Sequence, residues 1–303
     1  MSTLGGMAVA DVAPPVAPLL DALDPEQRAA AVLPDGPAQV IAPAGSGKTT
    51  TLIARLGVLM SRGVSAERIA VVTFNREAAA ELSSRVASRL GPLLPGAACV
   101  EVRTLHALAR QVLLDGAGPV RLLADRLPLL RAARRRIMAG RSPDDPPVPD
   151  AAALDTLLSA WKIEGRPPPD EARPALDVFA GLLAARGAID FDDLVVRAVD
   201  LLERDAALRR RWQARFSHMA VDEFQDVDAA QLRLVRILAE PEQNLFVVGD
   251  DDQTIYAWRL AEVKQAGSQV EAGGAVTLPI AATRRRSSSS RRQRHPGPVS
   301  RKR

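Results

Sequence analysis

The stretch Ala42-Pro-Ala-Gly-Ser-Gly-Lys-Thr-Thr50 decides the fold of this chain. A short apolar run precedes it, and residues 51–56 after it have helical spacing. A strand, a glycine-rich turn that ends in Gly-Lys-Thr and a helix are together typical of a phosphate-binding loop. Gly45 and Gly47 allow backbone N–H groups to turn inward around an anion, and the helix N-terminus adds unpaired N–H groups and the positive end of its dipole.

Two side chains of this stretch carry the specific chemistry. Lys48 is placed to reach the β- and γ-phosphates of a nucleotide, and the Thr49 hydroxyl is placed to ligate Mg²⁺. The strict pattern opens with glycine, whereas this chain has Ala42 there. The alternative is an ordinary Gly/Ser turn before a helix, and the Lys-Thr pair in this flanking context argues against it.

The bulk composition indicates a helix-rich protein with a real core. The chain has 303 residues, a length that allows one large or two ordinary domains. Of these residues, 47% are apolar and 3% are aromatic. No apolar run reaches the ~18 residues of a membrane span, and residues 1–20 lack the basic flank of a secretion signal. Cys99 is the single cysteine, which excludes an intramolecular disulfide and favours a cytoplasmic enzyme. We expect Cys99 to be a small buried hydrophobe.

The basic character of the chain belongs to its tail. Residues 284–303 hold nine of the 40 basic residues and no acidic residue, which leaves 31 basic against 36 acidic residues, a net charge of −5, in the rest. Charge alone is therefore no argument that the folded part binds DNA. A DNA-binding role for the tail itself is a minor alternative, since Arg/Ser-rich tails are usually solvated.

Apolar runs alternate with helical segments along most of the chain. The runs that read as strands are 39–41, 68–74, 98–102, 216–221 and 244–249. Strands that alternate with helices predict an α/β fold in which a parallel sheet is covered on both faces. The sheet pattern resumes near Ile189 after a long interruption.

That interruption, residues 115–186, is predicted to be a helical insertion. Helical segments at 121–137 and 151–161 are separated by proline-rich breaks, and no strand signal occurs between them. A flexible linker is the alternative, but the spacing of the apolar residues within 154–161 favours a packed helix. The remaining predicted units are disordered residues 1–20, an ATP-binding domain from 21–114 and 187–265, and a disordered Arg/Ser-rich tail at 266–303.

Two helix starts have clear capping residues. Asp24 is a good N-cap with Pro25 at the first helical position, and Gln27 falls at the third position, where capping boxes place Glu or Gln. Gln27 therefore has a structural explanation beside any functional one. Asn75 is predicted to cap the helix that runs to Arg89.

Acidic residues stand at the ends of two predicted strands. Asp222 can hold Mg²⁺ opposite Thr49, and Glu223 can accept a proton from an attacking water. Their alternative is an N-cap followed by a first-turn acid. The second strand end, 249–259, contains an amide at Gln253 that suits a γ-phosphate, and a Trp at 258 that is either a base-stacking platform or simply core.

Seven of these segments, in this order, resemble the motifs of superfamily 1 DNA helicases of the UvrD/Rep/PcrA type. They are the adenine-reading Gln motif (23–27), Walker A (42–50), two early single-strand-contacting motifs (73–82 and 104–106), the segment before Walker B (189–194), Walker B itself (221–226) and the motif that couples ATP to DNA (249–259). The resemblance covers residues 20–265. The Walker A motif of this family often opens with alanine, as it does here at Ala42. The resemblance implies a RecA-like P-loop NTPase domain, with the insertion as the family's domain 1B.

The resemblance also implies roles. The ATP cradle would be Ala44, Gly45, Ser46, Gly47, Lys48, Thr49 and Thr50. Gln27 would read adenine, Asp222 would bind Mg²⁺ with Thr49, and Glu223 would activate water. Gln253 would sense the γ-phosphate and Arg259 would relay that state. The residues near single-stranded DNA would be Thr73, Phe74, Asn75, His106, Tyr256 and Trp258.

The expected function is therefore the ATP-binding portion of a 3′-to-5′ DNA helicase that uses ATP and Mg²⁺ and takes single-stranded DNA as its partner. The family's second RecA-like domain has no counterpart after residue 264, where the sequence becomes unlike the family, so we expect a helicase fragment. An arginine from that second domain is worth about 10³ or more in turnover. The alternative is a module that binds ATP and DNA without unwinding.

Overall fold

The computed structural model describes residues 14–142, 144–250 and 276–279, the last four as backbone only. Its centre is a six-stranded sheet in the order β3-β2-β6-β7-β1-β8, in which every neighbouring pair is parallel. The strands are β1 (Ala38–Ile41), β2 (Ile69–Thr73), β3 (Glu101–Thr104), β6 (His218–Val221), β7 (Leu245–Gly249) and β8 (Val276–Pro279). The predicted α/β fold with a RecA-like parallel sheet is confirmed.

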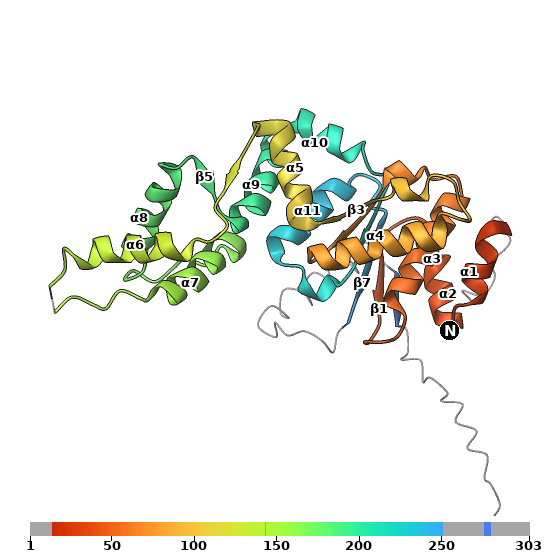
Figure 1. Cartoon of the computed structure of the whole chain (residues 1–303), viewed down its shortest axis with the longest axis horizontal. Coiled ribbons are helices and arrows are strands. Elements are labelled where there is room, and N and C mark those ends of the chain that lie inside the picture. The colour runs from red at the N-terminus through yellow and green to blue at the C-terminus, as the bar shows by residue number, and fades with distance from the viewer. Residues whose placement is uncertain (1–13, 143, 251–275, 280–303) are drawn as a thin grey trace, which may run out of the picture.

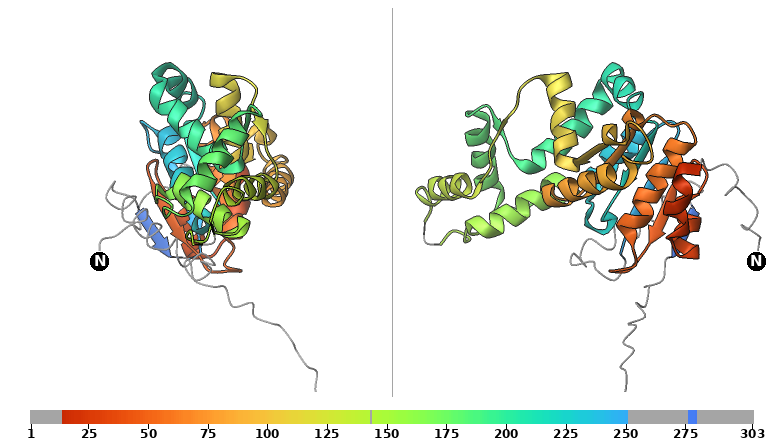
Figure 2. Two further views of the ribbon diagram at one scale, coloured as in Figure 1. Left: turned by 90° about the vertical axis from the view of Figure 1, so that its left-hand side faces the viewer. Right: turned by 45° about the vertical axis from the view of Figure 1, so that its right-hand side comes forward.

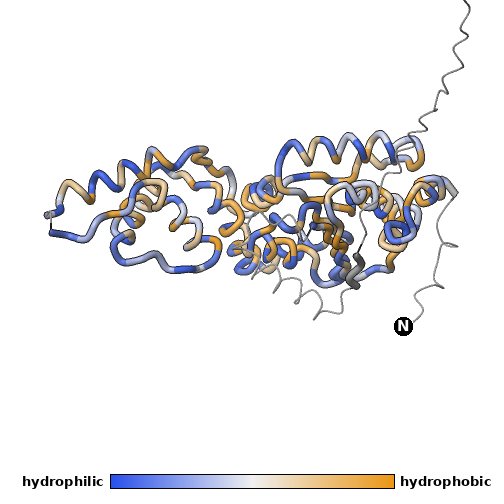
Figure 3. Tube along the Cα trace, turned by 90° about the horizontal axis from the view of Figure 1, so that it is seen from below, coloured by the Kyte–Doolittle hydropathy of each residue, from blue (hydrophilic) through white to orange (hydrophobic). Residues whose placement is uncertain are grey.

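Helices cover both faces of the sheet, because successive residues of a strand point to opposite sides. Val71 packs with α3 (Lys48–Ser61) and α4 (Arg76–Leu90), whereas Val72 packs on the other face. The helices on that face are α5 (Leu105–Ala117), α9 (Phe191–Arg204), α10 (Ala206–Gln213) and α11 (Ala229–Ala239). The layers can be followed in Figure 1, and the tube in Figure 3 changes between blue and orange along the helices. Among the described residues, no helix is both long and apolar enough to span a membrane.

The N-terminal segment is helical from residue 14, so the disorder predicted for 1–20 is wrong for the described part of that range. The elements here are η1 (Pro14–Val16), α1 (Ala17–Asp21) and α2 (Pro25–Ala31). Val16 and Leu20 are buried in one cluster with apolar side chains of α2 and α3. The Ala/Pro-rich composition obscures these two residues, which are four apart and therefore share one helix face.

Three helices form a separate lobe beside the sheet, as Figures 1 and 2 show. They are α6 (Leu127–Met138), α7 (Ala151–Glu164) and α8 (Arg173–Ala184). Their facing apolar side chains, among them Leu130, Leu154 and Phe179, make a core of their own. The lobe falls within residues 115–186, the predicted helical insertion.

Two short strands at the base of this lobe correct two predictions. β4 (Arg121–Leu122) pairs in parallel with β5 (Ala188–Ile189), apart from the main sheet. The helix predicted over 121–137 therefore begins only at α6, where Pro128 occupies the first turn, the one part of a helix that tolerates proline. The strand signal near Ile189 belongs to this pair and does not resume the main sheet.

Arg126 links the lobe to the sheet domain. Its guanidinium donates to the carboxylates of Asp155 in α7 and of Asp190 and Asp192 at the start of α9. Lys162 of α7 adds a bond of 2.8 Å to Asp190. The Arg126 side chain is 14% exposed and that of Asp190 is 1% exposed, so water screens these charged hydrogen bonds little. The network therefore fixes how the lobe meets α9.

The third strand begins later than the predicted run 98–102. Residues Ala97–Cys99 form a short 3-10 helix, η3, and β3 starts at Glu101. The turn directs Ala97 inward and Cys99 outward. Cys99 is therefore exposed, and the prediction that it is buried is wrong.

The chain returns to the sheet near its C-terminus. β8 pairs in parallel with β1, with Val276 opposite Ala38. The disorder predicted for 266–303 is therefore wrong for 276–279, because a short apolar run is enough to add a strand beside β1. The other residues of that range lie outside the described part of the chain.

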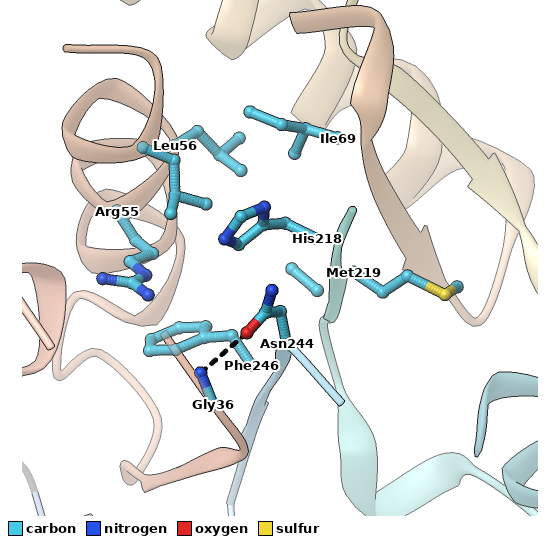
Figure 4. Close-up of a pocket in the computed structure, with 10 residues that line it drawn as sticks. Gly36, Arg55, Leu56, Ile69, His218, Met219, Asn244 and Phe246 are labelled. Atoms are coloured by element: carbon cyan, nitrogen blue, oxygen red, sulfur yellow. Dashed lines mark hydrogen bonds between the residues drawn. The ribbon is translucent and has the colours of Figure 1, made fainter. Parts of the chain in front are cut away.

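Arg55 of α3 closes the amino-terminal end of the sheet. Its guanidinium donates to the main-chain carbonyls of Ala31, Leu33 and Pro34, in the connection from α2 to β1. Burial lowers the pKa of Arg55 to about 10. Beside it, against His218, lies a cavity of about 10 Å³, which is room for roughly one water (Figure 4). The opposite, carboxyl edge is left for the site.

We expect Arg55→Met to lower the melting temperature. Methionine keeps the apolar stem but removes the bonds to the carbonyls of Ala31 and Pro34, at about 1–3 kcal/mol for each buried group left without a donor. The Leu33 carbonyl keeps a bond from Arg62. Differential scanning fluorimetry of the full chain measures the change. Arg68→Met is the matched control, since Arg68 is an exposed arginine in η2 (Ala66–Arg68). Equal melting temperatures for the two variants would contradict the role given to Arg55.

Candidate nucleotide and nucleic-acid site

The phosphate loop joins β1 to α3 at the carboxyl edge of the sheet. Gly45 and Gly47 have φ of +75° and +84°, in the left-handed region that favours glycine. Ala42 N–H donates to the carbonyl of Gly249, at the end of β7, over 2.8 Å. The N-terminus of α3, with its unpaired N–H groups and Lys48 as its first residue, therefore lies at this edge.

Hydrogen bonds of the Gln27 side chain link the phosphate loop to α2. Gln27 Oε1 accepts from Asp24 N–H over 3.1 Å, which confirms the predicted capping role. Its Nε2 donates to the Ser46 carbonyl over 2.6 Å, a contact that the spacing did not predict. Adenine reading stays a prediction, and the second N–H and the second lone pair of the amide remain to serve it. A Cβ on Gly47 would lie 2.7 Å from Gln27 Nε2, so a larger residue there would displace the end of the Gln27 side chain.

Lys48 meets carboxylates from two neighbouring strands. Its Nζ lies 3.2 Å from Glu223 Oε2 and 4.0 Å from Asp250 Oδ2. Glu223 follows β6 by two residues and Asp250 follows β7 directly, and these strands are adjacent and parallel. The structure therefore brings Lys48 and Glu223, predicted from separate motifs, into one site. The structure also places Asp250 in this site. The sequence indicated this residue only as an acid directly after an apolar run.

Asp222 is buried, whereas the adjacent Glu223 is half-buried. Asp222 is 8% exposed, its N–H donates to the Val72 carbonyl over 2.9 Å, and its Oδ1 accepts from Glu223 N–H over 3.1 Å. Burial first, and then the charge of Glu223, raise the pKa of Asp222 to about 6. A cation beside this carboxylate would offset both effects.

The donors at this edge fit a Mg²⁺ ion that arrives with a nucleotide. The described residues contain no group of three or more His, Cys, Asp or Glu side chains able to hold a metal on their own. Mg²⁺ usually takes one or two protein carboxylates and completes its shell with phosphate oxygens and waters. Asp222 and the Thr49 hydroxyl suit that pattern. The buried Ser46 hydroxyl, which has no partner in the described part of the chain, adds another polar atom inside the loop.

The residues predicted to contact single-stranded DNA begin at the end of β2. Phe74 is 39% exposed, and Asn75 caps α4 by accepting from Ala78 N–H over 2.7 Å. Thr73 is fully buried as the last residue of a strand that is buried throughout. Its side chain is therefore not on the surface, which corrects the DNA contact predicted for it.

His106 stands at the start of α5, after the neighbouring strand β3. Its ring meets that of Phe191 in a T-shaped contact, with centroids 6.0 Å apart and an interplanar angle of 72°. Burial lowers the pKa of His106, with Asp228 and Asp192 opposing, so burial favours the neutral ring. Phe191 is 41% exposed. Its exposure could not be predicted from the sequence, because Phe191 alternates with acidic residues that lie at the start of a helix.

Other predicted site residues fall in two groups. Ala44 and Thr50 are exposed, in the loop and in the first turn of α3. The remainder lie outside the described residues, and their roles stay predictions: Gln253, Tyr256, Trp258 and Arg259.

We expect Gly47→Ala to weaken nucleotide binding at least tenfold. The new Cβ would strain a positive φ and displace the Gln27 amide, which would break its hydrogen bond to the loop. Titration with the fluorescent analogue mant-ATP in the presence of Mg²⁺ measures the affinity. Gly63→Ala is the control, since Gly63 has φ +91° but open space around its Cβ position. If both variants lose affinity equally, general strain and not the loop is the cause.

The chain was compared with known proteins. The family described as UvrD/REP helicase N-terminal domain matches residues 23–132 and 152–269. The ATP-dependent DNA helicase PcrA of Bacillus subtilis is 36% identical over 265 residues, which cover 81% of this chain and 35% of that protein. The ATP-dependent DNA helicase Rep of Escherichia coli is 34% identical over 257 residues, covering 78% and 37%. The chain thus spans little more than a third of the length of these relatives, and it belongs to the UvrD/REP helicase family.

Proposed function

We propose that the chain binds ATP with Mg²⁺ at the Lys48 site and single-stranded DNA along the same sheet edge, as the ATP-binding portion of a 3′-to-5′ DNA helicase of the cytoplasm. The relatives are named ATP-dependent DNA helicases, and the proposal extends ATP and DNA to this chain. The observation that carries it is the meeting of Lys48 with Glu223 and Asp250 beside the phosphate loop. A loop lysine and carboxylates at neighbouring strand ends are the parts that phosphoryl transfer uses.

Nucleotide binding has to break an existing ion pair. Lys48 is balanced by Glu223 in this structure, and phosphate oxygens compete for its ammonium group. Once Lys48 contacts phosphate, Glu223 is free to accept a proton from the attacking water. Thr49 and Asp222 would hold Mg²⁺, which supplies charge neutralisation on the phosphate oxygens. Asp222 is kept in place for this by its backbone bond to Val72.

Stacking, and not net charge, supports the DNA contact. Phe191, at the start of α9, contacts the ring of His106, while Phe74 and His106 lie at the start of the segments that follow β2 and β3. Aromatic rings stack on any base, so such a surface binds single strands without reading their sequence. These elements begin at the same edge as the phosphate loop, because the strands are parallel.

The second candidate function is nucleotide and DNA binding without unwinding. The family model that matches describes an N-terminal domain, and the chain covers 35% of PcrA. A strand-separation assay on duplexes with a 3′ or a 5′ tail tests the two candidates. Separation of the 3′-tailed duplex alone supports the helicase. Tight binding of ATP and DNA with neither duplex separated supports the module.

We expect two substitutions to separate nucleotide binding from hydrolysis. Lys48→Ala removes the phosphate contact, so saturable mant-ATP binding is lost while the melting temperature is kept. Glu223→Gln releases Lys48 from its ion pair and tightens binding up to about fivefold, the range of partly exposed pairs. The same change lowers ATP hydrolysis about 10² to 10⁴-fold, since the general base is gone. Unaltered mant-ATP affinity in Lys48→Ala would remove the phosphate-loop assignment.

We expect Phe74→Ala to weaken binding of a fluorescent oligothymidine, measured by anisotropy. Loss of one stacked base costs about 1–3 kcal/mol, which is roughly 5- to 150-fold in affinity. Met138→Ala is the control, because Met138 is 44% exposed at the end of α6 in the separate lobe. A comparable loss in both variants would show that the effect is not stacking at this edge.

A further inference from the structure

Gln225 lies between the two acidic strand ends and bonds to both. It belongs to the short 3-10 helix η4 (Phe224–Asp226) and is 7% exposed. Its Nε2 donates to Glu223 Oε2 over 2.7 Å, and its Oε1 accepts from Asp250 N–H over 2.9 Å. The Gln225 amide thus links Glu223 to Asp250, which is the first residue after β7.

The surrounding backbone is built closely around this amide. A Cβ on Gly249 would lie 3.0 Å from Gln225 Oε1 and 3.3 Å from Gln225 N, so glycine leaves the space that the side chain needs. Glu223 itself has φ +52° and ψ +48°, a left-handed conformation that costs a non-glycine residue energy. Such conformations persist where neighbouring contacts hold them, and they cluster at functional sites.

Glu223 Oε2 is shared between two donors. Lys48 Nζ lies 3.2 Å from it and Gln225 Nε2 lies 2.7 Å from it. If Lys48 leaves for a phosphate group, the amide bond is the contact that still holds this oxygen in place. If the amide is absent instead, the carboxylate keeps Lys48 as its partner and competes more strongly with the nucleotide.

We propose that Gln225 is the positioning residue of Glu223: it keeps the carboxylate aimed at the phosphate site when Lys48 is released, and it ties that carboxylate to Asp250 at the start of the segment that follows β7. The proposal rests on the proposed function, because it names how the water-activating group of that site is held. An amide suits this position, since it donates to a carboxylate at one end and accepts from a backbone N–H at the other.

The test is a mutant cycle on the full chain, read as mant-ATP affinity with Mg²⁺. Gln225→Met keeps the size of the side chain but removes both bonds, and we expect affinity to fall about 3- to 10-fold, the range of one net hydrogen bond. In the Glu223→Gln background the same substitution should have no effect, because no carboxylate is left to hold Lys48. An equal loss in both backgrounds, or no loss in either, would overturn the proposal.

A second variant covers the case in which Gln225→Met does not fold. Gln225→Glu keeps the acceptor for Asp250 N–H and places a second carboxylate beside Glu223, so affinity should again fall. Combined with Glu223→Gln it swaps amide and carboxylate, which restores a donor–acceptor pair and should restore affinity. Failure of the swap to restore affinity would count against the proposal.

Two controls separate this proposal from the proposed function. Gln213→Leu removes another half-buried glutamine bond, of 2.8 Å to the Ile237 carbonyl on α11, and should leave affinity unchanged. If the parent chain itself shows no saturable mant-ATP binding, the proposed function fails and the role of Gln225 fails with it. If the parent binds and the cycle is additive, the role of Gln225 fails alone.

Discussion

The parallel pairing of β6, β7 and β1 is the constraint on which the site depends. Parallel strands end at the same edge, so the loop after β1, the acid after β7 and the Asp-Glu pair after β6 meet, although the loop at 42–50 lies far in sequence from residues 222, 223 and 250. The bond from Ala42 N–H to the Gly249 carbonyl carries this pairing one step past β1 and fixes where the loop starts. A reversal of any of the three strands would send its end to the edge that Arg55 closes.

The charged side chains at this carboxyl edge are neutralised either by one another or by a bound ligand. Lys48 is paired with carboxylates, and its side chain is 11% exposed, so it cannot simply be solvated. Asp222 sits nearby with a raised pKa because burial and Glu223 both disfavour its charge. A nucleotide bound with a divalent cation would change both conditions together, because phosphate oxygens would pair with Lys48 and the cation would offset the negative charge of Asp222. The proposed metal and nucleotide would therefore bind together rather than independently.

Sequence patterns predicted the features that depend on residue type and spacing over a few positions. They missed the features that depend on which distant segments pack together. The loop glycines, the caps at Gln27 and Asn75 and four of the main strands follow from residue type at short range. The pairing of β4 with β5 does not, because two-residue strands carry no periodicity. Exposure of Phe191 and burial of Thr73 were also missed, since they depend on which neighbours the fold brings up. The contacts of Gln225 were missed for the same reason, because its two partners follow different strands, Glu223 after β6 and Asp250 after β7.

The start of α9 joins the helical lobe to the aromatic surface. Phe191 is flanked in sequence by Asp190 and Asp192, and Arg126 of the lobe binds both carboxylates. The ring of Phe191 also contacts His106. A displacement of the lobe that keeps these ion pairs must therefore carry Phe191 with it, and a displacement that breaks them leaves largely enclosed carboxylates without their cation. The second is costly, so the lobe and this part of the proposed DNA surface should move as one body.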